Sequence, residues 1–454
     1  MNKLLIFSLL FIGQIILNIS NAYSKKINLI VDTQIENYLF ELSEPLIKAA
    51  GLDATSINFY IVNDDSINAF VSKGENIFVN SGLISKSDDP TLLAGVLAHE
   101  IGHIAGRHIA ISDETFSGVN NILILSYVAG IAAALSTSSG ADVASALILG
   151  GSQVAQRSAL KYTRHHEESA DQMALNFLQY ANYPADGLLN LMQIIKGFER
   201  NLVGDIDQYT ITHPISINRI NHIANFISKN PNNFTVGNKL QQEAKMIKSK
   251  LDGFLLDTNE VIRKYNCDSD YCLYAKSIAY YRKNQINKSL QLLNLLIENN
   301  SKNGYFYELK AQILFENNNV NSAILNYKKA LDLIDSNKSI IRILYANSIL
   351  TLADIKQSQI REAIDNLILA KNEQKDNWKI YYLLAKAYRQ ENDEVKSMIY
   401  LGYYNLYLEN FDQAIKYANA TKDSYKLNDK ESLLLEDLIK IAEDFKDKKS
   451  YWNS

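Results

Sequence analysis

The chain has 454 residues, of which 47% are hydrophobic and 21% charged, a balance typical of a folded globular protein. Its formal net charge is -4 and it contains no polybasic run, so nucleic acid is excluded as the expected partner. The length predicts two or three domains. Only 5 prolines and 19 glycines are present, and this scarcity of helix breakers favours a mainly α protein.

The first 22 residues are typical of a signal peptide. Lys3 precedes an apolar stretch from Leu4 to Leu17, and Ser20-Asn21-Ala22 places small residues where a signal peptidase cuts. The apolar stretch is short for a membrane span, which needs about 20 residues. We therefore expect cleavage after Ala22 and export of the chain; an uncleaved membrane anchor is the alternative.

Helix and strand patterns alternate over residues 27–85. Apolar residues at helical spacing extend over 26–50, and residues 57–62 are rich in the β-branched and aromatic side chains of a strand. Residues 71–79 predict two short strands around a turn that contains glycine. Asp88-Asp89-Pro90 then predicts the start of a helix. These elements indicate a small sheet followed by a long apolar helix.

That helix contains the segment His99-Glu100-Ile101-Gly102-His103. Residues four apart share a helix face, so His99 and His103 can both direct an imidazole at one zinc ion. Glu100 lies beside them, where its carboxylate can accept a proton from an attacking water. A catalytic zinc ion takes three protein ligands, so we expect a third ligand from a second helix.

Residues 162–171 offer the candidates for that third ligand. Glu167 and Asp171 are four residues apart and share a helix face. One carboxylate could bind the metal while the other holds an imidazole in place. The spacing alone leaves His165 and His166 open as rival ligands.

Residues 119–150 are apolar and rich in small residues, with a break at 136–140. Each half is too short to span a bilayer comfortably. We expect a helical hairpin that contacts the membrane surface, covers the active site or lies buried in the core. The pattern does not distinguish these alternatives.

From Asp270 onward the sequence repeats. Ser289 and Ala323 are small residues 34 positions apart, and so are Ala363 and Ser397. This is the period of the tetratricopeptide repeat, a pair of helices that stacks on its neighbours. The 40 positions from Ala323 to Ala363 indicate an insertion in the middle unit. We expect four units and a possible fifth around residues 409–414.

The chain has two cysteines, Cys267 and Cys272. The polar residues between them suggest a loop in which the thiols could form a local disulfide; two free thiols are the alternative. Their spacing is not that of a Cys-x-x-Cys metal site, so we do not expect them to bind metal.

The ordered motifs resemble the HtpX and CAAX-endopeptidase family of zinc metallopeptidases, and most closely its periplasmic BepA-type members with C-terminal tetratricopeptide repeats. The resemblance covers nearly the whole mature chain. Its motifs are Asn68-Ala69-Phe70, Gly74-Glu75-Asn76-Ile77-Phe78-Val79, Gly82-Leu83, His99-Glu100-x-x-His103 with Arg107-His108, Thr163-Arg164-His165-His166-Glu167-Glu168-Ser169-Ala170-Asp171, Thr212-His213-Pro214 and Arg219.

The resemblance assigns roles to four further residues. It implies that Glu167 is the third metal ligand and that Asp171 is an assisting acid, which donates a proton or holds a ligand. It places His213 near the metal, where this side chain either occupies the open coordination position or helps Arg219 to stabilise the oxyanion.

By spacing, His108 falls on the opposite face of the helix from His99 and is interpreted as structural. His222 is interpreted as a surface or packing residue.

The expected fold is mainly α. It comprises a signal peptide (1–22), an α+β peptidase domain with a small sheet (23–235), a helical linker (236–269) and a tetratricopeptide solenoid (270–450). We expect one Zn²⁺ per chain. We also expect the substrate to add a strand to the sheet along residues 77–80.

The resemblance further implies a periplasmic endopeptidase, peripheral to the outer membrane, that degrades misfolded or stalled outer-membrane proteins. Its repeats would recruit clients or the assembly machinery. The alternative is a chaperone or assembly scaffold whose zinc site is gated and mostly inactive.

Overall fold

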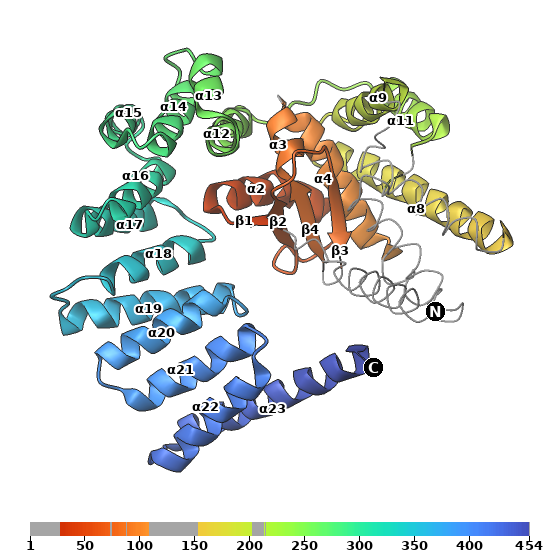
Figure 1. Cartoon of the computed structure of the whole chain (residues 1–454). Coiled ribbons are helices and arrows are strands. Elements are labelled where there is room, and N and C mark those ends of the chain that lie inside the picture. The colour runs from red at the N-terminus through yellow and green to blue at the C-terminus, as the bar shows by residue number, and fades with distance from the viewer. Residues whose placement is uncertain are drawn as a thin grey trace, which may run out of the picture. The chain divides into compact units, whose positions relative to one another are not determined.

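The computed structural model describes residues 28–72, 75–87, 89–108, 153–201, 213 and 215–453. The expected signal peptide (1–22) and apolar hairpin (119–150) lie outside these residues. The described chain forms two compact units. One contains β1 and residues 42–237, and the other contains residues 31–41 and 238–454. Helices dominate both units, and the only described sheet has four strands, so the prediction of a mainly α fold is confirmed (Figure 1).

The sheet of the first unit has the strand order β1-β2-β4-β3. β1 (Leu29–Ile30) pairs antiparallel with β2 (Asn58–Val62), which runs parallel to β4 (Asn76–Asn80), and β3 (Ala69–Ser72) pairs antiparallel with β4. Ile77 and Val79 of β4 are fully buried, as alternation along a strand with one buried face predicts. The predicted strands at 57–62 and 71–79 are therefore confirmed.

Two expectations about this region were wrong. The helix predicted over residues 26–50 begins later, because Leu29 and Ile30 pair with β2; helix α2 covers Thr33–Ala49. Residues 77–80 are also not at an edge of the sheet, because β4 lies between β2 and β3 and its hydrogen-bonding groups are used on both sides. A substrate strand cannot be added there. In the described part of the chain, β3 is the edge strand on that side.

Helix α4 (Pro90–Ala105) begins as the sequence predicts. The Asp89 side chain accepts a hydrogen bond from the backbone N–H of Thr91, and Pro90 occupies the first helical position. A short helix that the sequence pattern did not reveal, α3 (Ser81–Lys86), precedes it. α4 packs against β3 and against the helices α8 (Gln153–Tyr180) and α9 (Asp186–Asn201) (Figure 1).

Two glycines let the backbones of these helices approach closely. A Cβ atom on Gly102 would lie 2.8 Å from the carbonyl oxygen of Ala170 in α8. A Cβ atom on Gly95 would lie 2.5 Å from the backbone nitrogen of Leu188 in α9. Both positions therefore require the absence of a side chain. The first contact brings α8 directly against the part of α4 that carries the two motif histidines.

The last helix of the first unit is α11 (Ile217–Lys229). Its first turn is capped by Ser216, whose side chain accepts a hydrogen bond from the backbone of Arg219. α11 packs against α8 and α9. Residue 219 therefore faces the helix that carries residues 167 and 171.

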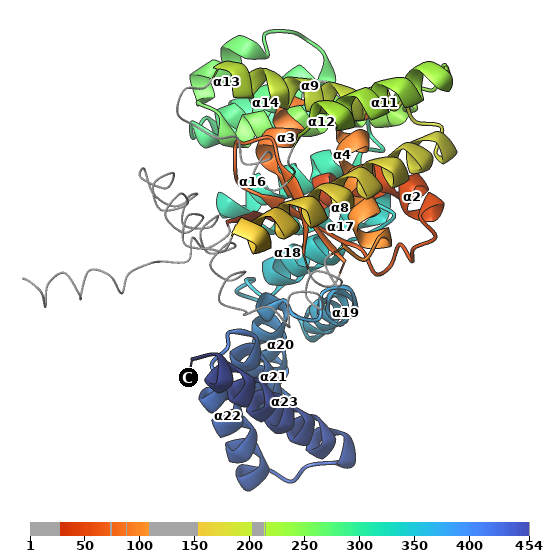
Figure 2. The same cartoon turned by 90° about the vertical axis from the view of Figure 1, so that its right-hand side faces the viewer.

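The second unit consists of helices that stack in pairs (Figures 1 and 2). After residues 31–41 of α2, it contains α12 (Asn238–Leu255), α13 (Thr258–Lys264), α14 (Asp270–Arg282), α15 (Ile286–Asn299), α16 (Gly304–Glu316), α17 (Val320–Leu333), α18 (Ser339–Ile349), α19 (Gln357–Glu373), α20 (Trp378–Gln390), α21 (Glu394–Tyr407), α22 (Phe411–Ser424) and α23 (Asp429–Asn453).

The small residues that define the repeat period occupy equivalent positions in these helix pairs. Ser289, Ala323, Ala363 and Ser397 are all buried in the second helix of successive pairs, as expected for tetratricopeptide repeats. The insertion lies in the loop between α18 and α19, which covers 350–356, whereas the loop between α16 and α17 covers only 317–319.

Asparagines end the first helix of several pairs. Asn284, Asn318 and Asn392 each adopt a positive φ, between 57° and 64°, and Glu409 does so before α22. Asparagine tolerates this left-handed conformation better than most residues. These asparagines thus lie where the chain reverses between paired helices.

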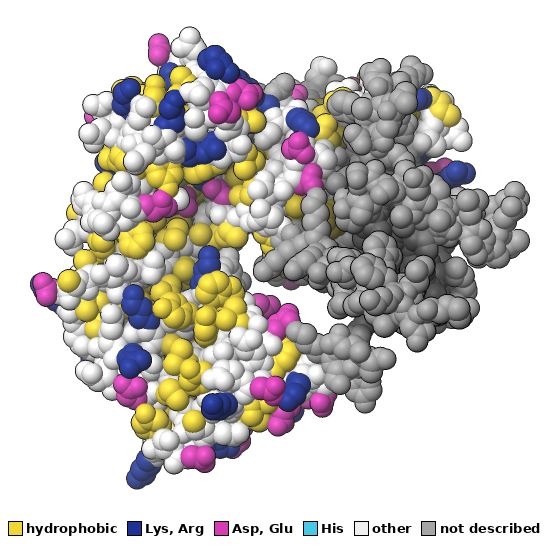
Figure 3. Space-filling model, viewed as in Figure 1, with side chains coloured by type: hydrophobic (Ala, Val, Ile, Leu, Met, Phe, Trp, Pro, Cys, Tyr) yellow, Lys and Arg dark blue, Asp and Glu magenta, His cyan; other side chains and the backbone are white. Residues whose placement is uncertain are grey.

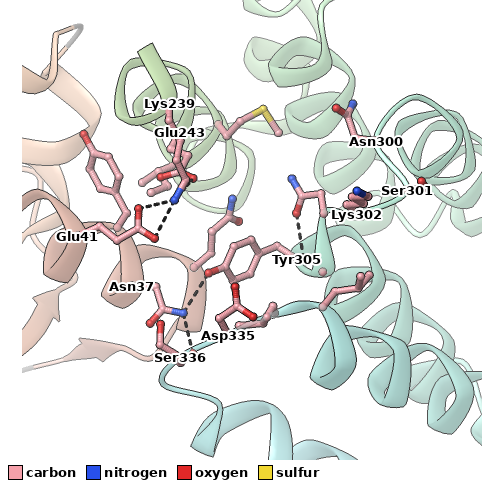
Figure 4. Close-up of a pocket in the computed structure, with 18 of the residues that line it drawn as sticks. Asn37, Glu41, Lys239, Glu243, Asn300, Ser301, Lys302, Tyr305, Asp335 and Ser336 are labelled. Atoms are coloured by element: carbon pink, nitrogen blue, oxygen red, sulfur yellow. Dashed lines mark hydrogen bonds and ion pairs between the residues drawn. The ribbon is translucent and has the colours of Figure 1, made fainter. Parts of the chain in front are cut away.

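Residues 31–41 contribute buried polar contacts to the second unit. Lys250 Nζ lies 2.6 Å from Asp32 Oδ2, and the hydroxyl of Tyr274 donates to Gln34 Oε1 at 3.1 Å. Asn37 Nδ2 donates to the hydroxyl of Tyr305 and to the backbone oxygen of residue 336 (Figure 4). A polar cavity of about 620 Å³ lies here, between α2, α12 and the loops before α16 and α18.

Two smaller features complete the fold. Cys267 and Cys272 form a disulfide, the first in the loop before α14 and the second in its first turn. Among the described residues, no helix is long and apolar enough to cross a membrane.

Candidate metal centre

Three elements bring the predicted site residues together. α4 supplies His99, Glu100 and His103, and α8 supplies Glu167 and Asp171. His213 and Arg219 come from the start of α11 and the segment before it. All of these side chains except His103 are almost completely buried, and His103 is partly buried. Such a concentration of imidazoles and carboxylates in a protein interior is typical of a metal site.

Four side chains could hold one cation. One ligand atom from each of His99, His103, Glu167 and His213 lies within 4.8 Å of the others. His103 Nε2 is 3.1 Å from His99 Nε2 and 3.3 Å from Glu167 Oε1. Lone pairs packed this closely repel one another unless protons or a cation lie between them. The set of nitrogen and oxygen donors is the one that zinc prefers.

His99 is oriented from behind by a carboxylate. Its Nδ1 lies 2.9 Å from Asp171 Oδ1, while its Nε2 faces Glu167 at 3.3 Å. Burial alone would lower the pKa of His99, but the Asp171 and Glu167 carboxylates raise it to about 10. A cation that binds Nε2 therefore has to compete with a proton there.

Arg219 fixes both carboxylates of α8. Its Nε donates to Asp171 Oδ2 at 2.6 Å, its Nη2 donates to Asp171 Oδ1 at 2.8 Å, and its Nη1 lies 2.9 Å from Glu167 Oε2. Burial by itself would raise the pKa of Asp171, but the hydrogen bonds from Arg219 and His99 lower it. The carboxylates of residues 167 and 171 are therefore held ionised and in fixed orientations.

Glu100 is fully buried, and among the described residues neither of its carboxylate oxygens has a hydrogen-bond partner. His213 Nε2 lies 3.5 Å from its Oε1. Burial raises the pKa of Glu100, whereas His213 and His99 oppose this rise. A buried carboxylate with unused acceptor positions is suited to bind a water molecule and to take its proton.

Three other histidines, His165 and His166 of α8 and His222 of α11, lie outside the four-residue group. His165 is exposed and His166 is half-buried, and neither belongs to the four-residue group. Glu167 is therefore the α8 member of that group. His222 is exposed and contacts Gln172 at 2.9 Å, as expected of a surface residue.

The placement predicted for His108 was wrong. It does not lie opposite the motif histidines: its Nδ1 is 3.0 Å from His103 Nδ1. The helical periodicity used for the prediction ends at Ala105, so it does not apply to residue 108. Gly106 was the sequence signal for the end of the helix, and Arg107 after it adopts a positive φ.

Comparison with known proteins agrees with this geometry. Residues 33–227 match the family model described as Peptidase family M48. The chain contains a peptidase M48 domain. The four-residue group and Glu100 all lie within this matched region.

Individual relatives match the chain in part. The "Beta-barrel assembly-enhancing protease" of Yersinia pestis is 26% identical over 313 residues, which are 67% of this chain and 63% of that protein. The "Metalloprotease YcaL" of Escherichia coli (strain K12) is 27% identical over 184 residues, 40% of this chain and 67% of that protein. The chain thus spans less than two thirds of the length of the first of these relatives.

Among solved structures, the "Crystal Structure of the Yeast Tom70" is 12% identical and covers 91% of this chain and 72% of that chain, with a TM-score of 0.32.

Proposed function

We propose that the protein is a zinc-dependent endopeptidase of the bacterial envelope. The observation that carries this proposal is the convergence of His99, His103 and Glu167 from two helices beside a buried carboxylate, Glu100, whose oxygens accept no hydrogen bond from the part of the chain that the structure describes. One Zn²⁺ per chain would be held by the two histidines and Glu167. When bound there, zinc would polarise the scissile carbonyl and lower the pKa of a water molecule.

The chain's own residues supply the proton transfers. Glu100 accepts the proton of the attacking water and returns it to the amine that leaves, the usual work of a general base and acid. Asp171 holds the Nδ1–H of His99, which keeps Nε2 available as a ligand. Because all three donor nitrogens of Arg219 face carboxylates of α8, we assign it to orienting Asp171 and Glu167 rather than to contacting the oxyanion.

We also infer that the substrate binds as an extended strand along β3. α4 packs directly against this strand, and β3 is the outer strand of the described sheet on that side. A peptide added here could form backbone hydrogen bonds, which are independent of the substrate's sequence. This arrangement suits a protease that acts on unfolded chains.

Digestion of an unfolded substrate such as casein tests the activity. The purified protein is expected to cleave casein, to lose this activity when a chelator removes its metal, and to regain it when zinc is added back. Activity that a chelator does not affect would contradict the proposal.

The repeats are proposed to recruit unfolded outer-membrane proteins or their assembly machinery, with the protein located in the periplasm. The name of the Yersinia pestis relative, a β-barrel assembly-enhancing protease, supports this role. Hydrophobic side chains are exposed on the face of the repeats seen in Figure 3. Trp378 and Tyr382 are 39% and 47% exposed, and both rings contact Tyr404, so they form one aromatic surface.

Capture of a purified, unfolded outer-membrane β-barrel protein tests this role. Replacement of both Trp378 and Tyr382 by Ser should weaken capture, since aromatic side chains dominate interface energies. Leu325→Ser is the matched control, because Leu325 is also exposed, at 69%, but lies in α17. Equal capture by all three proteins would exclude this surface.

A second candidate function is a chaperone or assembly scaffold with a gated zinc site. It is favoured by the position of His213, whose Nδ1 lies 3.3 Å from His99 Nε2 and 3.2 Å from Glu167 Oε2. An imidazole there occupies the space that a substrate carbonyl needs. His213→Ala should then raise casein cleavage strongly. Loss of cleavage in this variant would favour a role of His213 in the reaction.

A further inference from the structure

The chain reverses direction after the end of α4, and this reversal brings His108 next to His103 of the candidate metal site. The backbone N–H of Gly106 donates to the Gly102 oxygen at 2.9 Å, and Arg107 then adopts a left-handed φ of 54°. A left-handed residue after a helix reverses the direction of the chain. A Cβ atom on Gly106 would lie 2.4 Å from His108 Nε2, so a side chain at position 106 would displace the His108 ring.

His108 contacts two other histidines after this turn. Its Nδ1 is 3.0 Å from His103 Nδ1, with the two rings nearly perpendicular at 80°. It also stacks on the ring of His166, with the ring centroids 4.4 Å apart and the planes at 7°. The stack supports the imidazole from one side and leaves the Nδ1 edge directed at His103.

The contact constrains the proton of His103. A neutral imidazole has one N–H donor and one acceptor nitrogen. Two Nδ1 atoms at 3.0 Å form a hydrogen bond only if one of them carries the proton. When His103 Nδ1–H donates to His108, the lone pair of His103 lies on Nε2, the nitrogen that is 3.3 Å from Glu167 Oε1. His99 receives the equivalent support from Asp171, at 2.9 Å.

We propose that His108 is a positioning residue that accepts the Nδ1–H of His103 and so directs His103 Nε2 at the metal. This inference rests on the proposed zinc site. It assigns the two motif histidines different supports, a carboxylate for His99 and a neutral imidazole for His103. Metal-binding histidines commonly depend on such a partner, and its loss typically weakens metal affinity 10- to 100-fold, by order of magnitude.

Two substitutions separate the hydrogen bond from the ring packing. His108→Phe keeps a ring that can stack on His166 but removes the acceptor. His108→Asn loses the ring but retains an oxygen near the position of Nδ1. The zinc dissociation constant of the full chain is measured by competition with a chromogenic chelator. We expect an increase of about 10- to 100-fold for the Phe variant and of less than about threefold for the Asn variant.

The outcomes are distinguishable. Wild-type zinc affinity in His108→Phe would overturn the inference, and so would an equal loss in the Phe and Asn variants, because the ring rather than the acceptor would then matter. His99→Ala is measured in parallel. If His99→Ala also binds zinc as the wild type does, the proposed zinc site itself is wrong. If only His99→Ala loses affinity, the site stands and the role of His108 fails.

Discussion

Arg219 and Asp171 form a bidentate ion pair in the interior of the peptidase domain, with Nε–Oδ2 and Nη2–Oδ1 distances of 2.6 and 2.8 Å. Both residues are at most 2% exposed. Removal of one partner leaves the other charge buried without compensation, which typically costs about 3–5 kcal/mol. The pair joins α11 to α8, so we expect it to matter for stability and for the geometry of His99.

Arg219→Ala should therefore lower the free energy of unfolding by about 3–5 kcal/mol and weaken zinc binding, because Asp171 and Glu167 lose their shared donor. Urea unfolding and chelator competition measure the two effects. Arg164→Ala is the matched control, since Arg164 is an exposed residue of the same helix, α8. Similar stabilities of the two variants would refute a structural role of the buried pair.

Glu100→Gln should abolish proteolysis while zinc stays bound. The amide has nearly the shape of the carboxylate but cannot accept the proton of the attacking water, and Glu100 is not in the four-residue metal group. Loss of a general base typically lowers the rate by about 10²- to 10⁴-fold. Casein cleavage and metal content are measured on the same preparation. Cleavage at the wild-type rate would show that Glu100 is not the base.

Gly102→Ala should separate α4 from α8. The new Cβ atom would lie 2.8 Å from the Ala170 oxygen, so one helix must shift, at a typical cost of about 1–3 kcal/mol. The shift also moves Glu167 away from His99 and His103, so zinc affinity should fall. In Gly197→Ala, a control in α9, the new Cβ atom meets nothing within 4 Å. In unfolding and zinc-binding measurements, this control should match the wild type in zinc affinity and should be as stable as the wild type or slightly more stable.

The second unit should lose stability as the pH rises from about 4.5 to about 8. Burial raises the pKa of Glu36 to about 8, although a hydrogen bond from the Asp32 backbone opposes this rise. Burial also raises the pKa of Glu308 to about 7, against the attraction of Lys250. A carboxyl group with a raised folded-state pKa contributes its stability fully below the ordinary pKa, 4.5 for Glu, and loses it as the pH passes the folded-state value.

Unfolding measured between about pH 4 and 9 should thus show a decline of up to about 1.4 kcal/mol per pH unit for each of these groups. Glu36→Gln should flatten this decline, because the amide does not ionise. Glu44→Gln, at a more exposed position of the same helix, serves as the control. Parallel profiles for the wild type and Glu36→Gln would show that this carboxyl does not carry the effect.

The sequence was most informative where function depends on local spacing. His99 and His103 lie on one helix at a fixed interval, so their convergence follows from helical geometry. The repeats were equally visible, because Ser289 and Ala323 must fill equivalent gaps between paired helices. The choice of Glu167 over His165 and His166 needed the family resemblance, since three consecutive polar residues give no indication of which one faces α4.

Contacts between distant segments were beyond the reach of sequence patterns. The periodicity of α4 predicted a location for His108 that the end of the helix at Ala105 invalidates. The strand order placed β4 inside the sheet, although the pattern of residues 77–80 is equally compatible with an edge. The ion pair between Asp32 and Lys250 joins residues more than 200 positions apart, and neither position looks unusual in sequence.

Zinc analysis of the purified full-length protein tests the central claim most directly. The wild type is expected to contain about one zinc ion per chain, because the proposed site supplies the three protein ligands of a single catalytic zinc ion. Glu167→Ala should lose most of this metal, whereas Glu168→Ala, the exposed neighbour in α8, should retain it. A wild-type protein without metal, or equal zinc content in both variants, would contradict the assignment of His99, His103 and Glu167 as the site.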